Sequence, residues 1–591
     1  MKKSIITLAI IILFSIEIYA IYPINIASLS FIGNNSISAS KIKSVIPIKS
    51  PNYLTKVKDK IPFVTTDKIY FYETDMINAV NAIINLYQKN GFLHATVSYK
   101  TTKKNNAYHV EFHIIENNQT YIETVQVKTE SNYADSVIYS RNPQKWENIK
   151  YTDDKFYEIK SNIEQILLEN SYIMSKIDYS FDLNKDSTRV KINFNINEGA
   201  QFEIDSIRLN GLEMLNQKTV LNQIPLKKNQ MYHPYLIDFY TFQLAQLTHF
   251  KSINVDVIPM PESANLAQIS FRLNEQRKHQ FKSGIGYGIE DKIRAFIEYN
   301  QYNFLGNARH LQLNIKTSVI EPWNINLKTR EPLPFRHSTY GSVNPFWIKQ
   351  KEDIYELQRK GFILGYSQNL SITNNYQLYY LFERIHLYTA DVFDTDQLQS
   401  LYNKSSVYLT YSSNYVKKEK GFSNTISLLR SGVGFNSTYH FFRALNTFNY
   451  YYPITQSNSF AFQMKYGHLL SFDKDKIVPI EERYYSGGAN SIRGWARNQI
   501  SPINENKEKT GGNRLIEFSI ENRKIIFKDL EFALFYDIGN VWETKVDTSN
   551  LLSSVGFGLR YYSILGPIRL DFARPLDIDR WQFYLQLGQS F

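Results

Sequence analysis

The stretch Glu481–Trp495 reads EERYYSGGANSIRGW and combines paired glycines, aromatic residues and a single arginine. Its Gly487-Gly488 pair permits backbone angles that larger residues avoid, so the stretch is predicted to be a folded-back loop. Arg493 is an isolated cation with Gly494 beside it. A guanidinium held among aromatic side chains needs an acceptor, because an unpaired buried charge is very costly. Three aromatic residues flank this cation in the sequence: Tyr484, Tyr485 and Trp495.

Two downstream carboxylates are candidate partners for Arg493. Glu521 ends the segment GGNRLIEFSIE, and Asp537 lies in FYDIGN. We predict that the loop tucks into a β-barrel and that Arg493 is tied to the barrel wall through these acids. The alternative is an ordinary surface loop with a solvated arginine, because a motif match is only a hypothesis.

The composition limits the class of protein. A chain of 591 residues is too long for one ordinary domain. The formal net charge is +11, but the lysines are scattered without a basic block or a nucleic-acid motif, so no nucleic-acid partner is expected. The sequence contains no cysteine, which excludes disulfides, thiolate metal sites and cysteine nucleophiles. Aromatic residues make up 15% of the chain, as the aromatic girdles of a membrane barrel would explain.

Residues 1–20 have the features of a secretory signal peptide. Lys2 and Lys3 are followed by the apolar run Ile5–Phe14, and Ala20 could precede the cleavage site. The alternative is an uncleaved anchor. No later stretch reaches about 18 uninterrupted apolar residues, so any later membrane span is expected to be β.

An internal repeat follows the signal segment. The pattern Phe-x-(Ile/Leu)-x-Glu begins at Phe112, Phe194 and Phe271, at intervals of about 80 residues. Helical patterns lie between the strands of each unit. We therefore predict three repeats of β-α-α-β-β order, whose exposed sheet edges could add a strand from a client protein by β-augmentation. The alternative is that they are spacers. The predicted boundaries are 21–118, 119–199 and 200–277.

From residue 278 to residue 591, alternation of apolar and polar residues replaces helical periodicity. A soluble sandwich also alternates, but the preceding signal segment and the even number of strands favour an outer-membrane β-barrel of about 16 antiparallel strands. With the N-terminus in the periplasm, an inserted loop at about 471–511 would lie at the outer surface. The predicted strands start near residues 280, 292, 308, 322, 337, 357, 374, 404, 421, 437, 458, 512, 530, 551, 566 and 580.

The same alternation places Glu521 and Asp537 on the lumen side of their strands. A bidentate arginine–carboxylate contact there would hold the loop inside the barrel. Glu517, one inward position earlier, is the alternative acceptor. Arg560 and Asp571 also face inward and are candidates to pair with each other.

The first barrel strand carries Gly284, Gly286 and Gly288 on one face. Glycine weakens strand pairing and leaves space, so the seam between this strand and the last strand, which ends at Phe591, is predicted to open sideways. The alternative is that the glycines make room for the inserted loop.

Through these residues and motifs, the chain resembles the BamA/TamA superfamily of outer-membrane assembly barrels with periplasmic POTRA domains. YYSGGANSIRGW is similar to the family's loop signature, with Ile492 where valine is usual. LFYDIGNVW resembles its Phe-x-Asp-x-Gly strand motif, and GGNRLIEFSIE resembles the strand that supplies the glutamate partner. Ser171 departs from the pattern, because glycine is expected there. The resemblance carries over Gly487, Gly488, Arg493, Gly494, Trp495, Glu521, Phe535, Asp537 and Gly539.

The resemblance implies a non-enzymatic factor in the outer membrane of a Gram-negative cell that inserts or exports client proteins. Three repeats look most like the TamA type, which implies a TamB-like periplasmic partner. The alternative is a dedicated secretion pore of the two-partner type, and a passive porin would have no use for the repeats. No HExxH, GxSxG or P-loop motif is present in the sequence, and neither a cofactor nor a metal is expected.

Overall fold

A computed structural model provides the structure of the protein. The chain divides into two compact units, and each is described by itself: one holds residues 1–203, 231–234 and 259–266, and the other holds 204–230, 235–258 and 267–591. The predicted signal segment and Phe591 lie outside the described residues. These are 25–48, 71–104, 107–131, 136, 138, 143–224, 229–260, 265–334, 337–390, 399–417, 420–473, 476–563 and 566–587.

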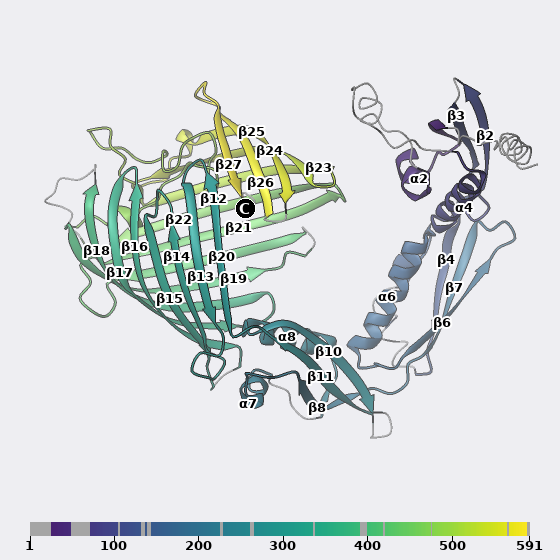
Figure 1. The fold of residues 1–591 in the computed structure, drawn as a ribbon, viewed down its shortest axis with the longest axis horizontal. Coiled ribbons are helices and arrows are strands. Elements are labelled where there is room, and N and C mark those ends of the chain that lie inside the picture. The colour runs from purple at the N-terminus through teal and green to yellow at the C-terminus, as the bar shows by residue number, and fades with distance from the viewer. Residues whose placement is uncertain are drawn as a thin grey trace, which may run out of the picture. The chain divides into compact units, whose positions relative to one another are not determined.

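The first repeat is a three-stranded mixed sheet with a long helix along one face (Figure 1). Its central strand β3 runs parallel to β1 and antiparallel to β2. Every second residue of β3 is buried from Val110 onward, as the period of a strand requires. The elements are β1 (Asn25–Ile32), α2 (Ala39–Val45), α4 (Glu73–Lys89), β2 (Thr96–Lys104) and β3 (Ala107–Ile115).

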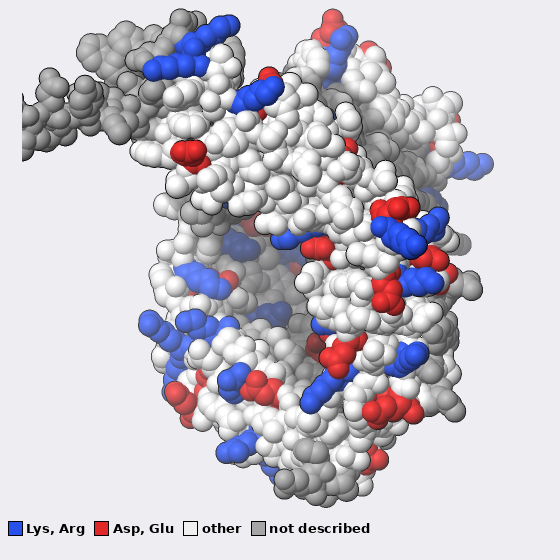
Figure 2. Space-filling model, turned by 90° about the vertical axis from the view of Figure 1, so that its right-hand side faces the viewer, with Lys and Arg blue, Asp and Glu red and all other residues white. Residues whose placement is uncertain are grey.

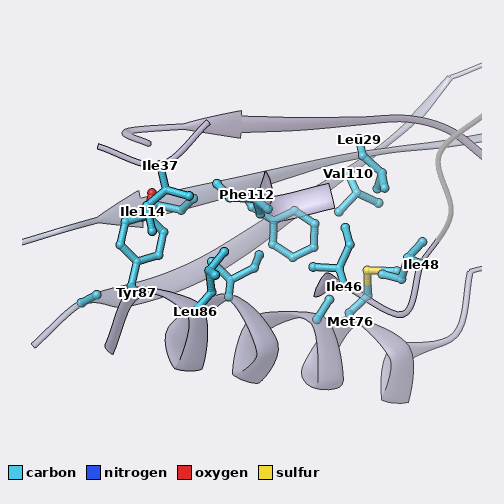
Figure 3. Packing of buried hydrophobic residues seen from close by; sticks show 14 of the residues in the cluster. Leu29, Ile37, Ile46, Ile48, Met76, Leu86, Tyr87, Val110, Phe112 and Ile114 are labelled. Atoms are coloured by element: carbon cyan, nitrogen blue, oxygen red, sulfur yellow. The ribbon is translucent and has the colours of Figure 1, made fainter. Parts of the chain in front are cut away.

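Helical spacing explains how this helix packs. The side chains of Met76, Leu86 and Tyr87 on α4 point at the sheet, where they meet Phe112 and Val110 (Figure 3). Their spacing places them on one face of the helix, so one apolar stripe fills the core.

The second and third repeats are four-stranded sheets, in the orders β5-β4-β7-β6 and β10-β11-β8-β9. Ser171, which stands where glycine was expected, adopts a φ of 71° and is buried, and its hydroxyl donates to the carbonyl of Tyr232. The elements are β4 (Tyr121–Lys128), η1 (Pro143–Trp146), β5 (Ile149–Lys150), α6 (Asp153–Glu169), β6 (Lys176–Leu183), β7 (Arg189–Asn197), β8 (Glu203–Asn210), α7 (Gln217–Leu221), β9 (Gln230–Met231), α8 (Pro234–Gln246), β10 (Phe250–Met260) and β11 (Leu266–Glu275).

The structure gives the repeated glutamate a common role. In each repeat, a glutamate at or just after the end of the last strand accepts a backbone N–H from the turn that follows the first strand, and so closes the unit. Burial opposes the charge of Glu198, but hydrogen bonds from Ser131 and Glu130 outweigh it and lower its pKa. The bonds run from Ser36 to Glu116 at 2.8 Å, from Glu130 to Glu198 at 2.9 Å and from Leu215 to Glu275 at 3.0 Å.

Sixteen strands form one antiparallel sheet in sequence order, which curves into a nearly closed barrel (Figure 1) and confirms the predicted strand number. No helix in the described part of the chain is long and apolar enough to span a bilayer. The strands are β12 (His279–Gly288), β13 (Lys292–Gln301), β14 (His310–Thr317), β15 (Trp323–Pro332), β16 (Thr339–Glu352), β17 (Tyr355–Asn369), β18 (Asn374–Ala390), β19 (Leu401–Asn414), β20 (Gly421–Ser431), β21 (Phe441–Thr455), β22 (Asn458–Ser471), β23 (Arg514–Phe527), β24 (Leu530–Trp542), β25 (Leu552–Ser563), β26 (Gly566–Pro575) and β27 (Gln582–Leu587).

The third repeat packs against the end of the barrel at which the first strand, β12, begins. Burial lowers the pKa of His249, and its Nε2 accepts the backbone N–H of Asn303 at 2.9 Å. The side chain of Asn303 donates to the carbonyl of Met214 at 2.7 Å. Because the strands alternate in direction and β22 is the eleventh, β22 ends at the opposite end of the barrel, and the loop between β22 and β23 leaves from there.

Charges are mixed on the face of the molecule that Figure 2 shows. Lys and Arg lie there among Asp and Glu and form no continuous basic patch. The scattering of lysines along the sequence predicts such a surface.

We predict that Gly33→Ala destabilises the first repeat far more than Gly199→Ala destabilises the second. Both glycines have positive φ, 86° and 65°. A Cβ at Gly33 would lie 2.0 Å from the carbonyl oxygen of Ile114, whereas one at Gly199 would meet nothing within 4 Å. Conformational strain alone costs about 1 kcal/mol, and the clash should raise the cost at Gly33 to about 3 kcal/mol or more.

Urea unfolding of the full chain, followed by pulse proteolysis of the repeats, measures both free energies. Equal losses of stability in the two variants would contradict the role of the close approach at Gly33.

Candidate functional site

Arg493 lies inside the barrel with 1% of its surface exposed. Its guanidinium grips Asp537 with two hydrogen bonds of 2.7 Å, and its backbone N–H donates to the same carboxylate at 3.1 Å. Nη1 donates to Glu521 at 2.5 Å and lies 3.4 Å from Asp571. The loop is therefore bonded to three strands of the wall, β23, β24 and β26.

Strand register brings these acids together. Ser519 of β23 stands opposite Asp537 of β24, and Glu521 stands one inward position further along β23. The hydroxyl of Ser519 donates to Asp537 at 2.6 Å. Because alternate residues of a strand share a face, inward acids on adjacent strands form one cluster.

Three wall arginines balance the cluster. Arg523 contacts Glu521 at 2.8 Å, and Arg569 contacts Asp571 at 3.3 Å. Arg560 contacts Asp571 at 3.2 Å, as the sequence suggested, but it also reaches Glu521 at 3.3 Å. Glu521, Asp571 and Arg560 each contact more than one opposite charge, so removal of one member leaves others buried without full compensation, at a cost of about 3–5 kcal/mol.

The aromatic ring that contacts the Arg493 guanidinium is Phe535, and not one of the aromatic residues that flank Arg493 in the sequence. The guanidinium carbon lies 3.4 Å from the centroid of Phe535, within cation–π distance. Trp495 instead packs with Ile492, and the hydroxyl of Tyr484 donates to the carbonyl of Ala444 at 2.7 Å. Phe535 was expected from the strand motif, but its place under Arg493 could not be read from the loop.

The glycines permit close packing of the loop on the wall. Gly494 has a φ of 101° and lies against Pro575, where a Cβ would come within 3.0 Å. Gly487 and Gly488 have φ of 95° and 109°. A Cβ at Gly539 would lie 2.2 Å from the carbonyl oxygen of Ile516 on β23 and 3.0 Å from Ile492 Cδ1, so this glycine permits close approach of both the neighbouring strand and the loop.

Glu517 does not contact Arg493. Its carboxylate accepts the hydroxyls of Ser486, at 2.6 Å, and of Ser491, and it pairs with Lys465 at 3.2 Å. Glu517, the alternative acceptor, therefore holds the loop at Ser486 and Ser491 and not at Arg493.

A second anchor of the loop was missed by sequence reasoning. Glu482 pairs with Lys404, which is fully buried and lies 2.8 Å from Glu383. Arg359 donates twice to Glu383, at 2.8 and 3.0 Å. The partners lie on β17, β18 and β19. The one signal in the sequence was the presence of charged residues, Glu383 and Lys404, within strands.

The seam glycines accommodate neighbouring side chains. At Gly284 and Gly286 the nearest atoms to an added Cβ belong to Phe296 and Arg294 of β13. At Gly288 they belong to Asp291. The three nearest atoms at each position come from the first hairpin and none comes from the inserted loop, and both interpretations of these glycines stay predictions.

No group of three or more His, Asp or Glu side chains among the described residues is arranged to hold a metal ion. The site instead consists of ion pairs and hydrogen bonds that position a loop.

Comparisons with known proteins agree with this fold. Residues 303–591 match the Omp85 superfamily domain, and residues 24–117 match the surface antigen variable number repeat, a POTRA model. The chain is 20% identical over 469 residues to the outer membrane protein assembly factor BamA of Nitratidesulfovibrio vulgaris, covering 75% of this chain and 57% of that protein. It is 19% identical to BamA of Neisseria meningitidis serogroup B over 88% of this chain and 73% of that protein.

The crystal structure of BamA from Haemophilus ducreyi lacking POTRA domains 1–3 has a similar fold. The match has a TM-score of 0.54 at 19% identity and covers 78% of this chain and 99% of that one.

We predict that Arg493→Lys releases the loop from the wall while the barrel stays folded. Lysine keeps the charge but loses the fork that grips Asp537. For a loss of about 2 kcal/mol, amide hydrogen exchange in the loop peptide 486–497 should accelerate roughly thirtyfold. The protein would be measured in a lipid bilayer.

Arg497→Lys is the matched control, because this arginine of the same loop is 47% exposed where it pairs with Glu352. Its partner Glu352 is only 7% exposed, but the open side of Arg497 lets water replace much of the contact, so exchange should change less than threefold, for about 0.6 kcal/mol or less. A similar acceleration of hydrogen exchange in the two variants would contradict the prediction that Arg493 holds the loop more strongly than Arg497 does.

Proposed function

The chain belongs to the Omp85 superfamily and is an outer-membrane protein with periplasmic POTRA repeats, and we propose that it inserts or exports client proteins at that membrane. The observation that carries the proposal is the seam. The described residues of β12 and β27 lie side by side (Figure 1) but form no ladder with each other. Two strand edges are therefore available for pairing with an incoming strand.

The second repeat supports a role in client capture. β6 is the last strand of its sheet, so one of its edges has no neighbour among the described strands. Tyr179, Phe181 and Leu183 are exposed along it, and Tyr157 is exposed on the helix α6 beside them. An edge with apolar side chains suits an extended segment rich in aromatic residues, because backbone bonds provide affinity and side-chain contacts provide selectivity.

A dedicated secretion pore of the two-partner type is the second candidate. It would pass a client through the lumen, where the loop is held at Arg493 and Glu482. Comparison of the outer-membrane proteome with and without the protein separates the two. Loss of many barrels indicates assembly, and loss of one secreted product indicates a pore. A TamB-like partner remains a proposal that co-purification would test.

Locking the seam should block client assembly. Cysteines at Tyr287 and Phe583, joined by a bismaleimide, would tie β12 to β27 in a chain that has no other cysteine. The control links Ile297 to Ile315, which are register partners within the β13–β14 ladder. The seam link is expected to reduce folded client at least tenfold in a reconstituted assay, and the ladder link to leave it unchanged. Normal assembly with the seam locked would defeat lateral opening.

Clients should contact the β6 edge during capture. A photoreactive phenylalanine analogue at Phe181 is expected to cross-link unfolded client. The same analogue at Ile77, which lies on α4 of the first repeat and is 52% exposed against 38% for Phe181, should not. Equal yields at the two positions, measured by mass spectrometry of the adducts, would show that the edge has no preference for client.

A further inference from the structure

The outer end of the seam contains a cavity. Its volume is about 530 Å³, and it is bordered by Ile289 and Glu290 of the first hairpin, by Gln582 and Tyr584 of the last strand, and by Ala496 and Arg497 of the inserted loop. Strand pairing does not close this end within the described residues, and the hydrogen bonds that span it there are made by the loop.

On one side of the seam, the loop is bonded to the last hairpin. The hydroxyl of Tyr584 on β27 donates to the carbonyl of Trp495 at 2.7 Å and accepts the N–H of Gly494 at 2.9 Å. Arg569 on β26 donates to the carbonyl of Ala489 at 2.7 Å and to Gln586 of β27 at 2.9 Å.

On the other side, the loop is bonded to the first hairpin. The N–H of Ala489 donates to the carboxylate of Glu290 at 2.9 Å. Gly488 makes this approach possible, because a Cβ there would lie 2.9 Å from the same oxygen and its φ is 109°. The N–H and the carbonyl of Ala489 therefore join the two sides of the seam.

We propose that Glu290 is a positioning residue that holds the seam closed by clasping the loop at Ala489, with Tyr584 holding the opposite side. The inference rests on the proposed lateral opening, and it assigns the control of that opening to the loop. A carboxylate that accepts a backbone N–H makes a charge-assisted bond. Breaking it frees the β12 edge without moving Arg493 out of its acid cluster.

The test measures the seam directly, in purified protein in a lipid bilayer without any client. Spin labels on Ile293→Cys and Ile578→Cys report the distance across the outer end by pulsed electron paramagnetic resonance. Glu290→Ala is expected to raise the ratio of open to closed molecules about tenfold, and Tyr584→Phe to raise it in the same direction. Heat-modifiable mobility on gels verifies that each variant barrel is folded.

Asp291→Asn is the matched control, because this neighbouring carboxylate pairs with Arg294 of β13 and not with the loop. Its distances should equal those of the parent. Unchanged distances in Glu290→Ala, or equal opening in Asp291→Asn, would overturn the clasp. Opening of the seam without any change in client assembly would keep the clasp and reject the proposed function.

Discussion

One buried cation constrains the second half of this chain. Arg493 lies in the lumen with 1% exposure, and such a charge is tolerable only if carboxylates surround it. Glu521, Asp537 and Asp571 supply that surrounding from three different strands. Each must face inward and stand at the right level, so the register of β23, β24 and β26 is tied to the conformation of the loop.

Among the contacts that hold the loop, two buried ion pairs have loop residues of opposite charge. Arg493 enters a group of acids on β23, β24 and β26, and Glu482 pairs with the cation Lys404 on β19. If Arg493 and Glu482 exchanged places, the arginine would face Lys404 and the glutamate would face the acids. The charge pattern of the loop therefore specifies which wall each end contacts, and the positive-φ glycines between the anchors allow the chain to turn from one to the other.

The sequence revealed the barrel well because alternation is a local signal. It placed the sixteen strand starts within a few residues, and it put Asp537 and Glu521 on the lumen side, where both contact Arg493. It could not reveal the Glu482–Lys404 pair or the Glu290–Ala489 bond, because these depend on which distant strands close the barrel. The repeated Phe-x-(Ile/Leu)-x-Glu pattern was visible, but that its glutamate closes a turn about 60–80 residues earlier needed coordinates.

The contacts of the loop differ in strength, which sets the order in which they can break. The grip on Asp537 is bidentate and fully buried, so its rupture would strand charges at a cost of about 3–5 kcal/mol. The bond from Ala489 to Glu290 is single and borders a cavity, so water can replace it at a net cost of about 1–3 kcal/mol. The first hairpin should therefore leave the loop before the loop leaves the wall. The buried ion pairs of Arg493 then keep the loop in place on the barrel wall while the seam opens and closes.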